Sequence, residues 1–95
     1  MKITLHSKDG CPYCSMARAW LADRNLAVEE VKWNDDAERR SLYADLSREF
    51  GQKVSTVPQI VLEEKGRKTL INGFTALKTS ELAQRLSTSL DDVDF

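Results

Sequence analysis

The chain has 95 residues, of which 31% are charged and 41% hydrophobic, and its formal net charge at pH 7 is −1. This length allows one domain with one modest core. The net charge excludes a broad basic surface for nucleic acid. The lack of a long apolar run excludes a membrane-spanning helix. Only two cysteines are present, which is unlike a secreted disulfide scaffold. The first residues lead straight into a strand without a signal-peptide core, so we expect a cytoplasmic protein.

The first two predicted elements are a strand and a helix. Apolar and polar side chains alternate over 3–6, which predicts the strand. The helix is predicted over 12–24, and its Met16 and Trp20 are expected to pack in the core. His6 is expected to pack under a helix with one hydrogen bond, although a histidine beside reactive thiols also invites the role of general base.

Two thiols stand three positions apart at the start of this helix, in the sequence Cys-Pro-Tyr-Cys at 11–14. The helix N-terminus favours negative charge, and Lys8 adds a positive charge nearby. We therefore expect the pKa of Cys11 to be lowered into the range of roughly 3.5–7.5 that is typical of cysteines so placed. Cys14 lies one turn further along, gains less from the helix end and is expected to be more buried. This asymmetry predicts that Cys11 attacks a disulfide and Cys14 later resolves the mixed disulfide.

Two other uses of the cysteine pair are possible. A structural zinc site needs four ligands, and the chain has only two cysteines and one histidine, so we expect no metal site. A structural disulfide over so short a loop would constrain little of the unfolded chain. The spacing is instead typical of a redox motif.

The remaining elements predict an α/β protein with a four-stranded mixed sheet. In chain order they are a strand over 28–33, a helix from a cap at Asp35 to a cap at Gly51, a strand over 59–62, a turn over 63–66 and a strand over 67–71. A last helix carries leucines from Leu77 to Leu90, and either Thr75 or Thr79 could cap its start. The first two strands form a parallel β-α-β unit and the last two a hairpin, so the first and third helices should cover one face and the second helix the other.

With these residues in this order, the chain resembles the dithiol glutaredoxins. The motif at 11–14 matches the family's active-site motif letter for letter, and Lys8 stands three residues before it, as in the family. Residues 56–58 match the family's cis-proline segment, and Gly73-Phe74 matches its glycine turn. The resemblance implies the thioredoxin fold, with sheet order 2-1-3-4 and an antiparallel third strand. It implies one domain over 1–90, followed by a solvated acidic tail over 91–95.

The family acts with glutathione as co-substrate, and the resemblance implies a role for each matched residue. Cys11 and Cys14 would be catalytic. Val57 would exchange backbone hydrogen bonds with the cysteinyl part of glutathione, beside a cis Pro58. The implied glutathione-binding residues are Lys8, Tyr13, Val57, Pro58, Gly73, Phe74 and Thr75.

Three features depart from the family pattern. Asn72 replaces the first glycine of the turn, Thr75 and Ala76 stand where the family usually has an acid, and the spacer from Gly51 to Thr56 is longer than is common. A charge-assisted hydrogen bond of the missing acid to the amino group of glutathione would be worth roughly 1.5–3 kcal/mol. The affinity for glutathione could therefore fall, or the Thr75 hydroxyl could restore it.

The resemblance implies a thiol–disulfide oxidoreductase that reduces glutathione mixed disulfides and protein disulfides. One alternative is an electron donor to ribonucleotide reductase that is itself reduced by thioredoxin reductase. Another is an iron–sulfur cluster-binding protein, against which Pro12 argues because cluster-binding relatives typically have glycine there; a redox-inactive adaptor is a fourth. The expected partners are glutathione and disulfide-containing or glutathionylated proteins, without nucleic acid or a membrane, and the expected state is a monomer.

Overall fold

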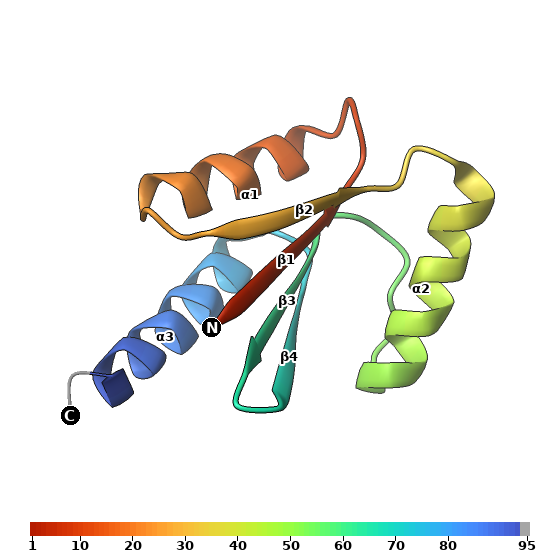
Figure 1. Ribbon diagram of the computed structural model, residues 1–95. Coiled ribbons are helices and arrows are strands. Elements are labelled where there is room, and N and C mark those ends of the chain that lie inside the picture. The colour runs from red at the N-terminus through yellow and green to blue at the C-terminus, as the bar shows by residue number, and fades with distance from the viewer. Residues whose placement is uncertain (94–95) are drawn as a thin grey trace.

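A computed structural model describes the backbone of residues 1–93 and the side chains of residues 1–86. The elements are β1 (Lys2–Ser7), α1 (Pro12–Asp23), β2 (Val28–Lys32), α2 (Asp36–Phe50), β3 (Gln59–Glu64), β4 (Arg67–Asn72) and α3 (Ala76–Val93) (Figure 1). The strands form one sheet in the order β2-β1-β3-β4. β1 and β2 are parallel, whereas β3 is antiparallel to both of its neighbours. The predicted thioredoxin-type sheet is confirmed.

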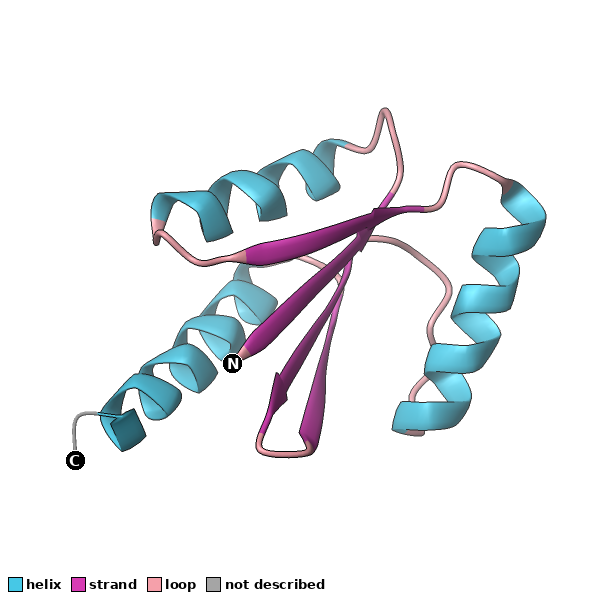
Figure 2. Ribbon diagram, viewed as in Figure 1, coloured by secondary structure: helices cyan, strands magenta, loops and turns pink. Residues whose placement is uncertain are grey.

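The sheet is covered on both faces, with α1 and α3 on one side and α2 on the other, as predicted (Figures 1 and 2). The core under α1 and α3 consists of Ile3, Leu5, Ala17, Leu21, Ile60, Leu62, Ile71, Phe74, Leu82 and Leu86. The smaller core under α2 consists of Leu42, Leu46, Val54 and Leu70. Alternate residues of each strand face opposite sides of a sheet, so one set of strands supplies both cores.

The helix ends follow the capping signals in the sequence. The Asp35 carboxylate accepts the Glu38 backbone N–H at 2.9 Å, and Gly51 ends α2 in the left-handed region at φ 63°. At α3, the Thr75 hydroxyl oxygen accepts the Lys78 backbone N–H at 3.3 Å, so Thr75 caps the helix. The choice that the sequence left open between two threonines is thereby settled.

The hairpin between β3 and β4 is tighter than predicted. The turn consists of Lys65 and Gly66 alone, both at positive φ (52° and 78°), rather than the whole of 63–66. Two-residue turns of this kind match the twist of antiparallel strands. Glu64 lies opposite Arg67 in the register, and opposite charges across a strand pair favour longer pairing. The predicted turn residues therefore continue the strand.

The prediction that Met16 packs in the core is wrong, because Met16 is 53% exposed. The buried positions of α1 are Cys14, Ala17 and Leu21. Met16 lies about 100° around the helix from Ala17, which turns it away from the sheet. Trp20 is half-buried at the edge of the core, where its ring meets the Phe74 ring edge-on with the ring centroids 6.4 Å apart.

The C-terminal end of the chain is described in part. The backbone of α3 continues to Val93. The predicted tail over 91–95 and the side chain of Leu90 lie outside the residues whose side chains are described. Within residues 1–93, no helix combines the length and the apolar character needed to cross a membrane.

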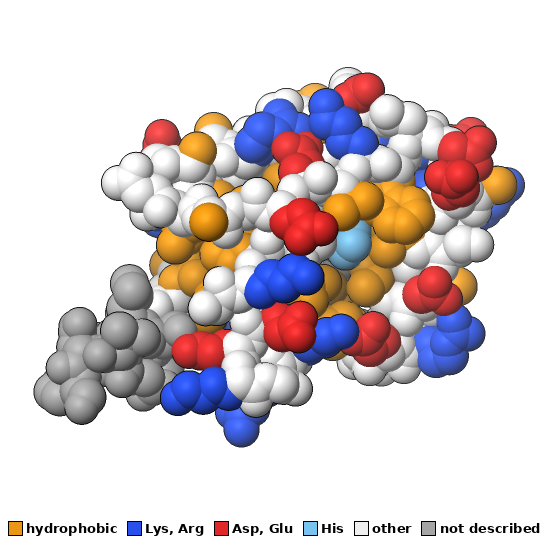
Figure 3. Space-filling model, in the orientation of Figure 1, with side chains coloured by type: hydrophobic (Ala, Val, Ile, Leu, Met, Phe, Trp, Pro, Cys, Tyr) orange, Lys and Arg blue, Asp and Glu red, His pale blue; other side chains and the backbone are white. Residues whose placement is uncertain are grey.

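His6 makes one side-chain hydrogen bond, as predicted, and its partner is Trp33 rather than a residue of the redox motif. The Trp33 indole N–H donates to His6 Nδ1 at 3.1 Å, and the two rings lie 6.0 Å apart. The histidine side chain is seen among hydrophobic side chains on this face (Figure 3). Burial lowers the pKa of His6 below its ordinary value. The neutral form, whose Nδ1 can accept the indole hydrogen bond, is therefore the folded form.

We predict that acid destabilises the protein through His6. The unfolded chain binds a proton to this residue below about pH 6.5, whereas the folded chain resists it, so the free energy of unfolding falls as the pH drops from 7 to 5. The loss should be about 1 kcal/mol, the worth of one such hydrogen bond. Urea titrations at several pH values measure it, with His6→Gln as a control that cannot titrate. Equal pH slopes for both proteins would contradict the prediction.

Candidate active site

Cys11 lies where β1 ends and α1 begins, and its sulfur caps the helix. The residue has extended backbone angles (φ −99°, ψ 109°), and its Sγ accepts the Cys14 backbone N–H at 3.3 Å. Pro12 occupies the first helical position, where a backbone N–H has no partner within the helix, so the lack of an N–H in proline costs no hydrogen bond. A donor at a helix N-terminus stabilises an anion more than a neutral group. The local structure therefore places a backbone donor and the start of a helix against the Cys11 sulfur.

Cys14 faces the interior and is fully buried, whereas Cys11 is 8% exposed. Burial, with the Cys11 sulfur as hydrogen-bond partner, raises the pKa of Cys14 to about 12, and the backbone of Lys8 opposes part of this rise. Both residues are free thiols. The predicted order of burial is confirmed, and it leaves Cys14 protonated while the Cys11 sulfur faces a hydrogen-bond donor.

The loop before β3 brings Val57 and Pro58 to the cysteines. The peptide bond between them is cis, as the resemblance implied. The Cys11 thiol lies 3.9 Å from the Val57 carbonyl oxygen, to which it can donate. Pro58 is fully buried and Val57 half-buried, so the Val57 backbone forms the wall of the site opposite the helix end.

The turn after β4 lies at the same edge of the sheet. Gln59 pairs with Asn72 in the register, which places Pro58 and Gly73 next to the same strand ends. Gly73 has φ 95°, a conformation that favours glycine. Phe74 is only 7% exposed, so its side chain belongs to the core and only its backbone can face a ligand. The roles in glutathione binding that the resemblance implied for Gly73 and Phe74 stay predictions.

Three other predicted residues lie around the motif. Tyr13 is 58% exposed on the first turn of α1. Lys8 forms no ion pair among residues 1–86, because the neighbouring Asp9 is held by Lys32 at 2.9 Å. The Thr75 hydroxyl oxygen already accepts the helix-capping hydrogen bond, which reduces its ability to replace the missing acid.

One residue of α2 has a shifted pKa that the sequence did not indicate. Burial raises the pKa of Tyr43, and the charges of Cys14 and Cys11 act on it in the same direction, while Arg39 opposes the rise. The sequence placed Tyr43 only beside an apolar helix face.

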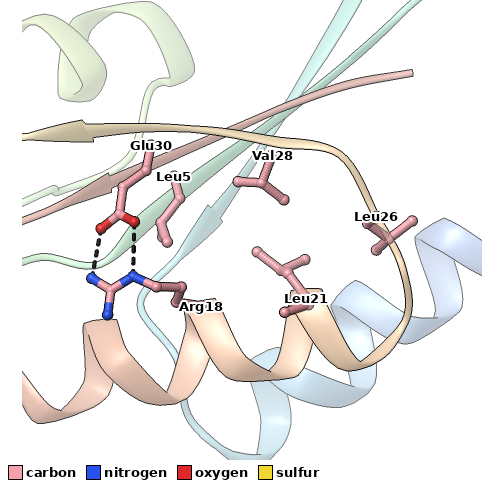
Figure 4. A pocket seen from close by; sticks show the side chains of 7 residues that line it. Leu5, Arg18, Leu21, Leu26, Val28 and Glu30 are labelled. Atoms are coloured by element: carbon pink, nitrogen blue, oxygen red, sulfur yellow. Dashed lines mark hydrogen bonds and ion pairs between the residues drawn. The ribbon is translucent and has the colours of Figure 1, made fainter.

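A cluster of three side chains, Arg18, Glu30 and Ser7, joins α1 to β2 and to the end of β1. Arg18 Nε and NH2 donate to the two Glu30 carboxylate oxygens at 2.7 and 2.6 Å (Figure 4), and the buried Ser7 hydroxyl donates to Glu30 at 2.6 Å. Arg18 lowers the pKa of Glu30 to about 2. A hollow of about 160 Å³ lies beside this pair, and neither cysteine lines it. The cluster fixes the helix that carries the thiols rather than forming part of their site.

Comparisons with known proteins agree with this geometry. A family model described as Glutaredoxin matches residues 3–66. A Haemophilus influenzae glutaredoxin is 34% identical over 68 residues, which cover 68% of this chain and 77% of that protein. The hybrid peroxiredoxin hyPrx5 of the same organism is 35% identical over 63 residues, but the match covers 66% of this chain and only 24% of that relative.

Solved structures extend the likeness over most of the chain. The crystal structure of glutaredoxin 1 from Francisella tularensis, complexed with cacodylate, matches with a TM-score of 0.73 at 27% identity. The match covers 92% of this chain and 96% of that one. Among residues 1–86, whose side chains are described, no group of three or more potential ligand side chains is arranged to hold a metal ion.

Proposed function

The chain belongs to the glutaredoxin family, and from this premise we propose that it is a glutathione-dependent thiol–disulfide oxidoreductase that reduces glutathione mixed disulfides and protein disulfides. Membership of the family supports thiol–disulfide exchange at a redox-active cysteine pair. The observation that carries the proposal is the contrast between the two thiols: the Cys11 sulfur faces a backbone donor at a helix end, whereas Cys14 is buried with a raised pKa. A reducing compartment such as the cytoplasm would keep both as thiols.

In the first proposed step, the Cys11 thiolate attacks the glutathione sulfur of a mixed disulfide. A new disulfide forms between Cys11 and glutathione, and the disulfide bond to the substrate breaks. The substrate leaves as a thiolate and takes a proton from solvent. The Cys14 backbone N–H, which points at the Cys11 sulfur, would favour return of negative charge to that atom in the next step.

Two routes restore the thiols. In the first, the thiolate of a second glutathione attacks the glutathione sulfur on Cys11, which releases oxidised glutathione and the Cys11 thiolate. In the second, used for protein disulfides, the Cys11 thiolate first attacks one sulfur of the protein disulfide, so that Cys11 becomes bonded to the protein and the protein's other cysteine leaves as a thiolate that takes a proton from solvent. Cys14 then gives its proton to solvent and attacks the Cys11 sulfur, which frees the protein as a dithiol after it takes up a second proton and leaves a disulfide between Cys11 and Cys14. Two molecules of glutathione then reduce that disulfide and become one oxidised glutathione.

We place glutathione along the edge formed by the Val57 backbone and the turn after β4. The Val57 carbonyl lies beside Cys11, where the cysteinyl part of the ligand must sit to react. The proposed contacts are those that the resemblance implied, namely Lys8, Tyr13, Val57, Pro58, Gly73, Phe74 and Thr75. With no carboxylate at 75 or 76, the amino group of the ligand lacks its usual partner there.

That missing carboxylate favours a second candidate function. In it, the same dithiol draws electrons from thioredoxin reductase and passes them to an acceptor such as ribonucleotide reductase. The Thr75 hydroxyl oxygen is engaged in capping α3, which weakens it as a substitute for the acid. The match to part of a hybrid peroxiredoxin adds a peroxiredoxin to the acceptors that we propose to assay.

We predict that glutathione reduces the oxidised protein and that thioredoxin reductase does not. The protein would be oxidised to the disulfide between Cys11 and Cys14, and the return of free thiols measured with either glutathione or NADPH plus thioredoxin reductase. Thiol recovery should be at least about tenfold faster with glutathione at matched reducing capacity. A reverse preference would favour the second candidate. Recovery with neither reductant would contradict both candidates.

A further inference from the structure

Two side-chain amides join the segments that line the proposed glutathione site. Gln59 is fully buried, and its Nε2 donates to the Thr56 carbonyl at 2.8 Å and to Asn72 Oδ1 at 2.7 Å. Asn72 Nδ2 in turn donates to the Lys53 carbonyl at 3.0 Å. We call these three hydrogen bonds, made by Gln59 and Asn72 to each other and to the carbonyls of Lys53 and Thr56, the amide clamp.

The Asn72 side chain both donates and accepts a hydrogen bond in the clamp. The Asn72 oxygen accepts from Gln59 while its nitrogen donates to Lys53. Gln59 Oε1 is buried and receives no hydrogen bond within the described part of the chain. The hydrogen bonds of the Gln59 side chain are therefore the two that its Nε2 donates in the clamp. An aspartate at 72 could only accept, and an alanine could do neither.

The clamp stands next to both proposed ligand-binding segments. Thr56 precedes Val57, whose carbonyl lies 3.9 Å from the Cys11 sulfur. Asn72 precedes Gly73, which begins the turn at φ 95°. The loop and the turn are far apart in sequence, and the clamp adds side-chain bonds to the strand pairing of Gln59 with Asn72. The family resemblance expects glycine at 72, which has no side chain, so the clamp is a feature of this chain.

We propose that Asn72 is a positioning residue that, through Gln59 and the Lys53 carbonyl, holds the Val57 backbone and the Gly73 turn as one preformed edge for the peptide-like ligand. The proposal rests on the proposed function for the identity of that ligand. Asn72 contacts neither cysteine in the hydrogen bonds of the site, so it acts on binding and not on sulfur chemistry. Rigid edges bind extended peptides more tightly because less ordering is needed on binding.

Asn72→Ala and Asn72→Asp separate the parts of the clamp. For a glutathionylated peptide, we expect Asn72→Ala to raise KM about tenfold with kcat within about twofold, and Asn72→Asp, which keeps the acceptor for Gln59 but turns a carboxylate oxygen toward the Lys53 carbonyl oxygen, to raise KM at least as much. The rate at which iodoacetamide alkylates Cys11 should stay within about twofold of the wild type. A fall in kcat with unchanged KM, or slower alkylation, would overturn the proposal.

Ser47→Ala is the matched control. Ser47 ties the same loop to α2, where its hydroxyl accepts the Val54 backbone N–H at 2.9 Å, but it does not bond to Thr56 or Asn72. This variant should lose stability, whereas its KM should stay within about twofold of the wild type. If both variants raise KM equally, the effect reflects a loosened loop in general and the proposal is wrong.

Backbone amide hydrogen exchange tests the clamp independently of glutathione. Exchange at Gln59 and Ile60, which pair with strands on both sides of β3, should be faster in Asn72→Ala than in the wild type or Ser47→Ala. If the wild type does not turn over glutathionylated peptide, the proposed function fails, and the clamp is judged on exchange alone. Unchanged exchange at both amides would overturn the clamp, whatever the activity.

Discussion

Cys11→Ser is expected to abolish the reduction of a glutathionylated peptide, with a loss of about a thousandfold or more. The Cys11 sulfur receives the Cys14 backbone N–H at the start of α1, and Cys14 is fully buried, whereas Cys11 is 8% exposed. A serine hydroxyl would keep the cap, since serine is a favoured capping residue, so the fold should survive. Thermal unfolding should therefore be close to that of the wild type while turnover is lost.

Cys14→Ser is the matched variant, because it removes the other sulfur of the same pair. We expect it to retain reduction of the glutathionylated peptide within about threefold, because a second glutathione can release the product without Cys14. Reduction of a protein disulfide should fall by about a hundredfold, because the mixed disulfide with the protein then lacks its resolving thiol. The reverse pattern in the two serine variants would contradict the assignment of roles.

Local patterns in the sequence account for much of what was predicted correctly. The order of elements follows from alternation in the strands and from caps such as Asp35 and Gly51, each of which acts within a few residues. The unequal burial of Cys11 and Cys14 follows from their spacing at the start of one helix. Such features need no knowledge of how distant segments meet.

The features that the sequence did not show depend on distant segments. The raised pKa of Tyr43 follows mainly from burial, which depends on how α2 packs on the sheet. The amide clamp requires Asn72 and Gln59 to meet across a strand pair, and in the sequence Asn72 was only a departure from a glycine pattern. The exposure of Met16 depends on which side of α1 faces the sheet, which a run of apolar residues on two sides left ambiguous.

Selective alkylation should show the contrast between the thiols most directly. With its pKa raised to about 12 by burial, Cys14 is ionised in only about one molecule in a thousand at pH 9. Because iodoacetamide reacts with thiolates, we expect one label per chain at pH 9, on Cys11, with Cys14 at least about a hundredfold slower. Unfolding in concentrated guanidinium chloride removes the burial and should expose both cysteines to the reagent. Comparable rates at the two residues in the folded protein would mean that Cys14 is not held as a thiol, and the order of attack and resolution would then lose its physical basis.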